Sequence, residues 1–103
     1  MVAVETKRER FVSVDLQKTE EGYNVLRAIL KDNPDAKVDE FPGYYKVKHS
    51  NKLTIKRETV ESFMGRPWDT QEFNLVIISY SGNFAEWDDE KIVIQWDTHM
   101  KKV

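Results

Sequence analysis

Apolar and polar side chains alternate over residues 11–17, which predicts a β-strand. The following apolar positions recur three and four residues apart, as they do on one face of a helix. These positions are Gly22, Val25, Leu26, Ile29 and Leu30. Thr19 before them fits an N-cap, and Asn33-Pro34 after them fits a stop signal, so we expect a helix between these points.

Turn residues divide the middle of the chain into short segments. Pro42-Gly43 separates a predicted strand at 37–41 from one at 44–49. The polar pair Ser50-Asn51 separates 44–49 from a further strand at 53–57. We therefore interpret the stretch from Tyr44 to Arg57 as a β-hairpin.

Two short helices are expected after this hairpin. Val60, Phe63 and Met64 share one helix face, and Gly65 stands where a left-handed C-terminal residue is needed. Asp69 with Glu72 three residues later resembles a capping box, which predicts a second helical turn.

The nearly unbroken apolar run at 75–80 is too short for a good helix and predicts a central strand covered on both faces. Residues 82–90 are expected to form a loop, and 91–96 a last strand. The pattern predicts a single α+β domain over 11–97: strand-helix-strand-strand, then strand-helix-helix-strand-strand. The polar segments 1–10 and 98–103 are predicted to be mobile tails.

Composition narrows the possible partners and compartments. The formal net charge is -2 and the pI is near 5.7, so the chain has no global electrostatic reason to bind nucleic acid or an anionic membrane. The 103 residues include no cysteine, which excludes disulfides and thiolate metal sites and fits a reducing compartment. Residues 1–10 lack the apolar segment of a signal peptide. A cytoplasmic protein is expected.

Catalytic and metal-binding constellations are not evident in the sequence. The two histidines, His49 and His99, stand in a predicted strand and a predicted tail. The Glu-x-x-His pairs of a di-iron bundle and the glycine-rich motifs of nucleotide sites are missing. The acidic run 88–90 lacks the spacing of a calcium loop and is read as a solvated turn. We expect neither enzymatic activity nor a bound cofactor.

Positive charge and aromatic rings concentrate in the predicted hairpin. Its residues Lys46, Lys48, Lys52, Lys56 and Arg57 accompany Tyr44 and Tyr45. Such a face could bind nucleic acid as a small binding module. Its lysines could instead prevent edge-to-edge aggregation of the sheet, or form a basic patch that docks on an acidic protein groove. The sequence leaves these three readings open.

A longer pattern resembles a known family. Residues 53–72 contain Arg-Glu-Thr-Val-Glu, then Gly-Arg-x-Trp-Asp, then Gln-Glu. These elements resemble the small effector proteins of bacterial multicomponent di-iron monooxygenases, above all those of phenol hydroxylases and toluene monooxygenases. Asp32-Asn-Pro-Asp-Ala36, Ile78-Ser79, Gly82-Asn83 and the acidic run 88–90 follow the same order. The resemblance extends over residues 11–96.

The resemblance implies a regulatory subunit without cofactor or catalytic residues. Such effectors bind the di-iron hydroxylase component, gate oxygen and substrate access, and couple NADH use to hydroxylation. The reductase and ferredoxin components would be indirect partners.

The resemblance also implies a partner-binding surface on the exposed positions of 74–83, helped by the basic hairpin and the N-terminal tail. The candidate residues are Asn74, Val76, Ile78, Ser79, Tyr80, Gly82, Asn83, Arg66, Lys46 and Lys48. The related methane protein carries an asparagine at the position of Val76, and we hypothesise that Asn74, on the same strand face, supplies the lost hydrogen bond. For Arg66 two roles stay open: bonding helix-end carbonyls or reaching the partner.

Overall fold

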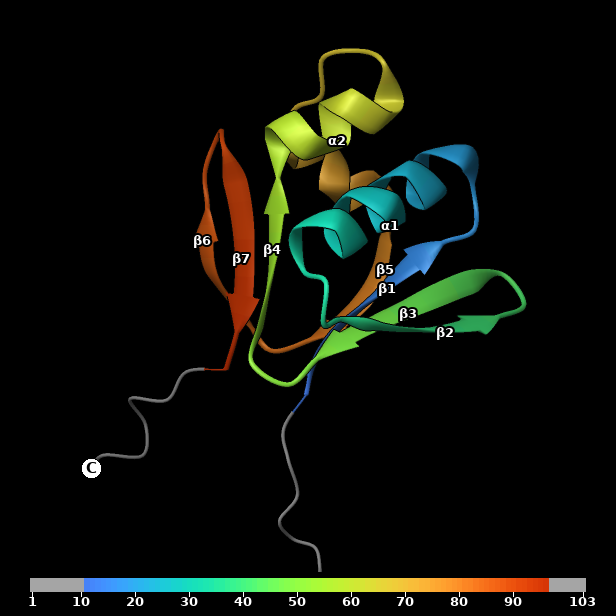
Figure 1. Ribbon diagram of the computed structural model, residues 1–103, viewed down its shortest axis with the longest axis vertical. Helices are drawn as coiled ribbons and strands as arrows, with labels where there is room; N and C mark the ends of the chain where they lie inside the picture. Colours follow the sequence, from blue (N-terminus) through green and yellow to red (C-terminus); the bar gives the residue numbers. More distant parts are fainter. Residues whose placement is uncertain (1–10, 97–103) are drawn as a thin grey trace, which may run out of the picture.

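The computed structural model describes residues 11–96, and the two predicted tails and His99 lie outside them (Figure 1). The elements in chain order are β1 (Val12–Gln17), α1 (Glu20–Asp32), β2 (Lys37–Phe41), β3 (Tyr44–His49), β4 (Lys52–Lys56), α2 (Arg57–Met64), the 3-10 helix η2 (Thr70–Leu75), β5 (Ile77–Ser81), β6 (Asn83–Trp87) and β7 (Lys91–Gln95).

The strands form two antiparallel sheets. The four-stranded sheet has the order β2-β3-β1-β5, and the three-stranded sheet has the order β4-β7-β6. The helices α1 and α2 lie in the angle between the two sheets (Figure 1). The predicted α+β class is confirmed, although β6 adds one strand to the expected order.

Most helix ends follow signals in the sequence, although α2 begins after Lys56 without a side-chain cap. The Thr19 hydroxyl accepts the N–H of Gly22 at 2.9 Å and caps α1. Gly65 ends α2 in the left-handed conformation, with φ 73°. Asp69 and Glu72 form the predicted capping box at η2. These capping residues therefore set the start of α1, the end of α2 and the start of η2.

The predicted hairpin from Tyr44 to Arg57 is wrong. β3 pairs with β1 and β2, whereas β4 pairs with β7 in the other sheet. The chain changes sheets at Ser50-Asn51, and the true hairpin joins β2 to β3 across Pro42-Gly43. A polar turn between two strands marks a connection, but it does not specify which strands pair.

The predicted central strand at 75–80 is also wrong. Leu75 ends η2, and β5 is an edge strand of the four-stranded sheet. Ile78 and Tyr80 are half exposed, whereas Val76 before the strand is buried. The expected loop at 82–90 contains β6, whose register shift between Phe84 and Glu86 hides the alternation that would have revealed a strand.

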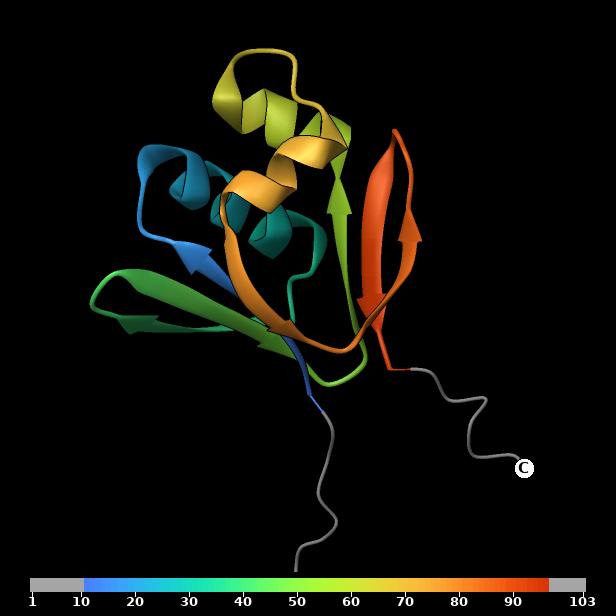
Figure 2. The same ribbon diagram turned by 180° about the vertical axis from the view of Figure 1, so that it is seen from behind.

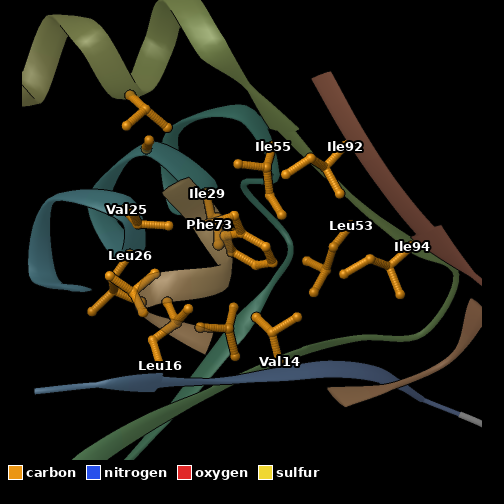
Figure 3. Close-up of a cluster of buried hydrophobic side chains, with 14 of the residues drawn as sticks. Val14, Leu16, Val25, Leu26, Ile29, Leu53, Ile55, Phe73, Ile92 and Ile94 are labelled. Atoms are coloured by element: carbon orange, nitrogen blue, oxygen red, sulfur yellow. The ribbon is translucent and has the colours of Figure 1, made fainter. Parts of the chain in front are cut away.

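The main core forms where α1, η2 and both sheets meet. Phe73 of η2 is fully buried and lies beside Ile29 of α1 (Figure 3). The same cluster includes Val14 of β1, Leu53 of β4 and Ile94 of β7, together with side chains of β3 and α2. Burying apolar side chains of this size stabilises each by about 1.5–3 kcal/mol.

Asn33 joins helix α1 to the edge of the three-stranded sheet. Its side-chain Oδ1 accepts the N–H of Thr54 at 3.0 Å, and its Nδ2 donates to the carbonyl of Thr54 at 2.8 Å. The same Nδ2 donates to the carbonyl of Ile29 at 2.7 Å. The amide thus pairs with β4 as a neighbouring strand would, and closes that edge.

The turn between β6 and β7 is held by one carboxylate. Asp88 Oδ1 accepts the N–H groups of Glu90 and Lys91 at 2.8 and 2.9 Å. These two bonds hold the pKa of Asp88 below its ordinary value of 3.8. The acidic run 88–90 is therefore a hydrogen-bonded turn.

We expect Asn33→Ala to lower the free energy of unfolding by about 3 kcal/mol, because it leaves both backbone groups of Thr54 without their partner. Urea denaturation measures the change. The matched control Asn51→Ala, in the exposed turn, should stay within about 0.5 kcal/mol of wild type. A loss at Asn33 as small as that of the control would contradict the account.

Asp88→Ala should destabilise the fold in a pH-dependent way. Because the folded pKa is lowered, the stabilisation is fully present above the unfolded value near 3.8 and is lost as pH falls through the folded value. Thermal unfolding at pH 7 and at successively lower pH should show the wild-type advantage shrink in acid. Asp89→Ala, which removes neither bond, is the control.

Candidate partner-binding surface

Exposed apolar side chains gather where η2 leads into β5. Leu75 is 65% exposed, Ile78 53% and Tyr80 50%, all within six residues. Tyr80 lies opposite the buried Val14 and Ser79 lies opposite Asp15, so these two side chains point to opposite faces of the edge strand. Single exposed apolar residues are ordinary, but several large ones on one edge are more typical of an interaction site. We call Leu75, Ile78, Ser79, Tyr80 and Asn83 the β5 surface, and Figure 2 looks onto the η2–β5 side of the molecule (orange).

The edges of the two sheets differ in how they are protected. Asn33 bonds the backbone of Thr54 on the edge strand β4, and the edge strand β6 carries Glu86, which pairs with Lys91 at 3.0 Å. The edge strand β2 carries three charges, at Lys37, Asp39 and Glu40. Both β5 and β6 contain a register shift, but β5 has the sequence IISYS and no charge. Among the described edge strands, β5 therefore lacks the charged side chains that discourage association.

Aromatic rings connect the β5 surface to the core. Tyr80 lies 4.6 Å from Phe84, Phe84 lies 4.8 Å from Trp87, and Trp87 meets Phe73 edge-on at 6.0 Å, all between ring centroids. The row runs from a half-exposed ring to a fully buried one. Tyr80 is therefore supported from beneath by packed aromatic contacts.

Three predicted site residues have structural roles. Val76 is only 3% exposed and is left out of the β5 surface. Asn74 lies in η2, so the prediction that it shares a strand face with Val76 is wrong, and its side chain donates to the carbonyl of Gln71 at 3.2 Å. Gly82 has φ 128°, and a Cβ there would lie 2.9 Å from Ile94 Cγ2 and 3.1 Å from Val12 Cγ1. Gly82 thus lets the chain pass between the sheets.

Arg66 ties the helices together. Its Nη2 contacts Glu21 at 2.8 Å and Glu72 at 3.2 Å, and its Nη1 donates to the carbonyl of Pro67 at 2.8 Å. Arg66 thus links the first turn of α1 to the capping box of η2. These contacts account for the arginine without a partner protein.

Lys46 and Lys48 lie on the face of the four-stranded sheet that points away from α1. Lys46 Nζ is 2.9 Å from Asp15 Oδ1, and Lys48 Nζ is 3.1 Å from Asp39 Oδ2. The other basic residues of the sequence cluster belong to β4 and α2. The basic residues therefore do not share one strand pair, and three of them, Lys46, Lys48 and Arg57, pair with carboxylates. Both observations disfavour the nucleic-acid-binding interpretation.

Asp15 is a residue that the sequence analysis did not select. It lies opposite Lys46 on β3 and opposite Ser79 on β5. The Ser79 hydroxyl donates to Asp15 Oδ2 at 2.7 Å. The polar positions of the first strand, Ser13, Asp15 and Gln17, were the available signal, but alternation alone does not identify which of them touches a candidate site.

Within residues 11–96, no cluster of three or more histidine, aspartate or glutamate side chains is arranged to hold a metal ion. In the same part of the chain, no helix is long and apolar enough to cross a membrane.

Comparison with known proteins identifies the family. The model of the MmoB/DmpM family matches residues 10–95. The stimulatory component DmpM of phenol 2-monooxygenase from Pseudomonas sp. (strain CF600) is 38% identical over 85 residues, which are 82% of this chain and 93% of that protein.

Solved structures extend the match to three dimensions. A chain from a phenol hydroxylase–regulatory protein complex superposes with a TM-score of 0.80 at 32% identity, covering 85% of this chain and 100% of that one. The soluble methane monooxygenase regulatory protein B shares the fold, with a TM-score of 0.69 and 21% identity over 96% of this chain and 72% of its own. The chain belongs to the MmoB/DmpM family.

Proposed function

We propose that this chain is the regulatory component of a phenol hydroxylase-type multicomponent monooxygenase, and that it binds the di-iron hydroxylase without catalysing a reaction itself. The observation that carries the proposal is the superposition, over 100% of its length, of a chain from a phenol hydroxylase–regulatory protein complex. The 38% identity to a stimulatory component of phenol 2-monooxygenase supports the same role. The absence of cysteine favours a cytoplasmic location.

The β5 surface is the part of this chain that we assign to the hydroxylase contact. It presents large apolar side chains on an uncharged edge, and Tyr80 rests on an aromatic row that extends into the core. A central apolar anchor with a polar rim is typical of protein interfaces. A stable contact requires roughly 1,200 Å² of buried surface in total, so the interface must extend beyond these five residues.

Regulation requires that the chain binds one hydroxylase conformation better than another. A difference in binding free energy of about 1–3 kcal/mol shifts the two populations about five- to 150-fold. We propose that the favoured conformation admits oxygen and substrate to the metal centre, which is how a protein without a cofactor couples NADH use to hydroxylation. The substrate is determined by the hydroxylase.

The proposed function is tested by steady-state hydroxylation with purified hydroxylase and its electron-transfer components, with and without this chain. Product formed per NADH consumed should rise and reach a maximum near one regulatory chain per active site. An unchanged rate and an unchanged ratio at micromolar concentrations of folded proteins would refute the role for that hydroxylase.

Ile78→Lys should weaken the stimulation without unfolding the chain. The side chain is 53% exposed, so lysine is tolerated in the free protein but places a charge where the interface excludes water. We expect the concentration for half-maximal stimulation to rise at least tenfold, which corresponds to about 1.4 kcal/mol.

The matched control is Val38→Lys, which places the same charge on the exposed edge strand β2, far from β5 in the sheet order. Its titration should overlay that of wild type. Equal losses for both variants would mean that β5 is not the preferred contact.

A further inference from the structure

Three polar side chains form a connected row on the outer face of the four-stranded sheet. Asp15 of β1 is the middle member. Its Oδ1 is 2.9 Å from Lys46 Nζ on one side, and its Oδ2 accepts the Ser79 hydroxyl at 2.7 Å on the other. The sheet register places both neighbours directly opposite Asp15, so the row follows from strand pairing.

The carboxylate of Asp15 is fixed rather than freely solvated. Its side chain is only 13% exposed, compared with 48% for Asp39, the other carboxylate on this face. Oδ1 lies at ion-pair distance from Lys46 Nζ but makes no hydrogen bond, whereas Oδ2 accepts the Ser79 hydroxyl. A hydrogen bond to a charged carboxylate is short and is among the stronger ones in proteins.

The row determines what Ser79 can offer to another molecule. A serine hydroxyl has one proton to donate and two lone pairs to accept. Because the proton is directed to Asp15, the exposed side of the oxygen presents only lone pairs.

We propose that Asp15 is a positioning residue of the β5 surface. It holds the Ser79 hydroxyl as a hydrogen-bond acceptor, and the hydroxylase group that meets Ser79 is therefore a donor, an N–H or O–H. The proposal rests on the proposed function, since it concerns the same docking surface. It adds Asp15 and Lys46 as residues that act through Ser79, and it specifies the chemistry of the facing group.

A double-mutant cycle tests this role. The dissociation constant for purified hydroxylase is measured by titration calorimetry with wild type, Ser79→Ala, Asp15→Ala and the double variant, since asparagine at this position would keep an oxygen that accepts the hydroxyl. Each single substitution should weaken binding about five- to tenfold, the loss expected for one good hydrogen bond. The double variant should be no weaker than either single one, because Asp15 acts only through the hydroxyl.

The matched control is Asp39→Ala, which removes the neighbouring carboxylate that pairs with Lys48. Its affinity should equal that of wild type. Ser79→Thr, which keeps the hydroxyl, should retain binding. Urea denaturation of every variant establishes that the folded fraction is the same.

Should Asp15→Ala fail to fold, Lys46→Met takes its place in the cycle. It leaves the Asp15 carboxylate intact but removes the cation that orients it. Its loss of affinity should likewise disappear in the Ser79→Ala background.

The outcomes distinguish the positioning role of Asp15 from the proposed function. Wild-type affinity for Asp15→Ala, or losses that multiply in the double variant, would overturn the positioning role while leaving the proposed function intact. Failure of the wild-type chain to bind the hydroxylase would overturn the proposed function together with the inference.

Discussion

The pairing between the Asn33 side chain and the backbone of Thr54 is the contact on which the arrangement of the two sheets depends. Each sheet is small, and a three-stranded sheet needs a packed apolar face to be stable. The amide fixes the end of α1 against β4, and this places Val25 and Ile29 over the apolar faces of both sheets. A single polar side chain thus sets the angle within which the core around Phe73 is filled.

This arrangement also explains why one edge is available for a partner. Asn33 bonds the backbone of Thr54 at the edge of β4, and β2 and β6 carry charged side chains. Within residues 11–96, β5 is the edge strand that joins an uncharged sequence to large exposed apolar side chains. Gly82 follows it immediately and carries the chain between the sheets. Ile78 and Tyr80 stay half exposed on this edge.

Capping residues in the sequence predicted the helix ends, because a cap acts on backbone groups only a few residues away. Thr19, Gly65 and the pair Asp69–Glu72 act on their own helix ends, and each was recognisable from sequence. Strand pairing was not predictable in this way, because β3 and β4 are separated by two residues yet belong to different sheets. Ile78, Ser79 and Tyr80 were selected through resemblance to the family. Leu75 and Asp15 were missed, since their positions depend on the end of η2 and on the sheet register.

The central claim is that the β5 surface contacts the hydroxylase, and hydrogen–deuterium exchange of this chain with and without purified hydroxylase tests it most directly. Protection on binding should concentrate on amides of residues 75–83, with little change in β2 at the opposite edge of the sheet. Protection confined to β2 or the exposed side of α1, with exchange at 75–83 unchanged, would contradict the account.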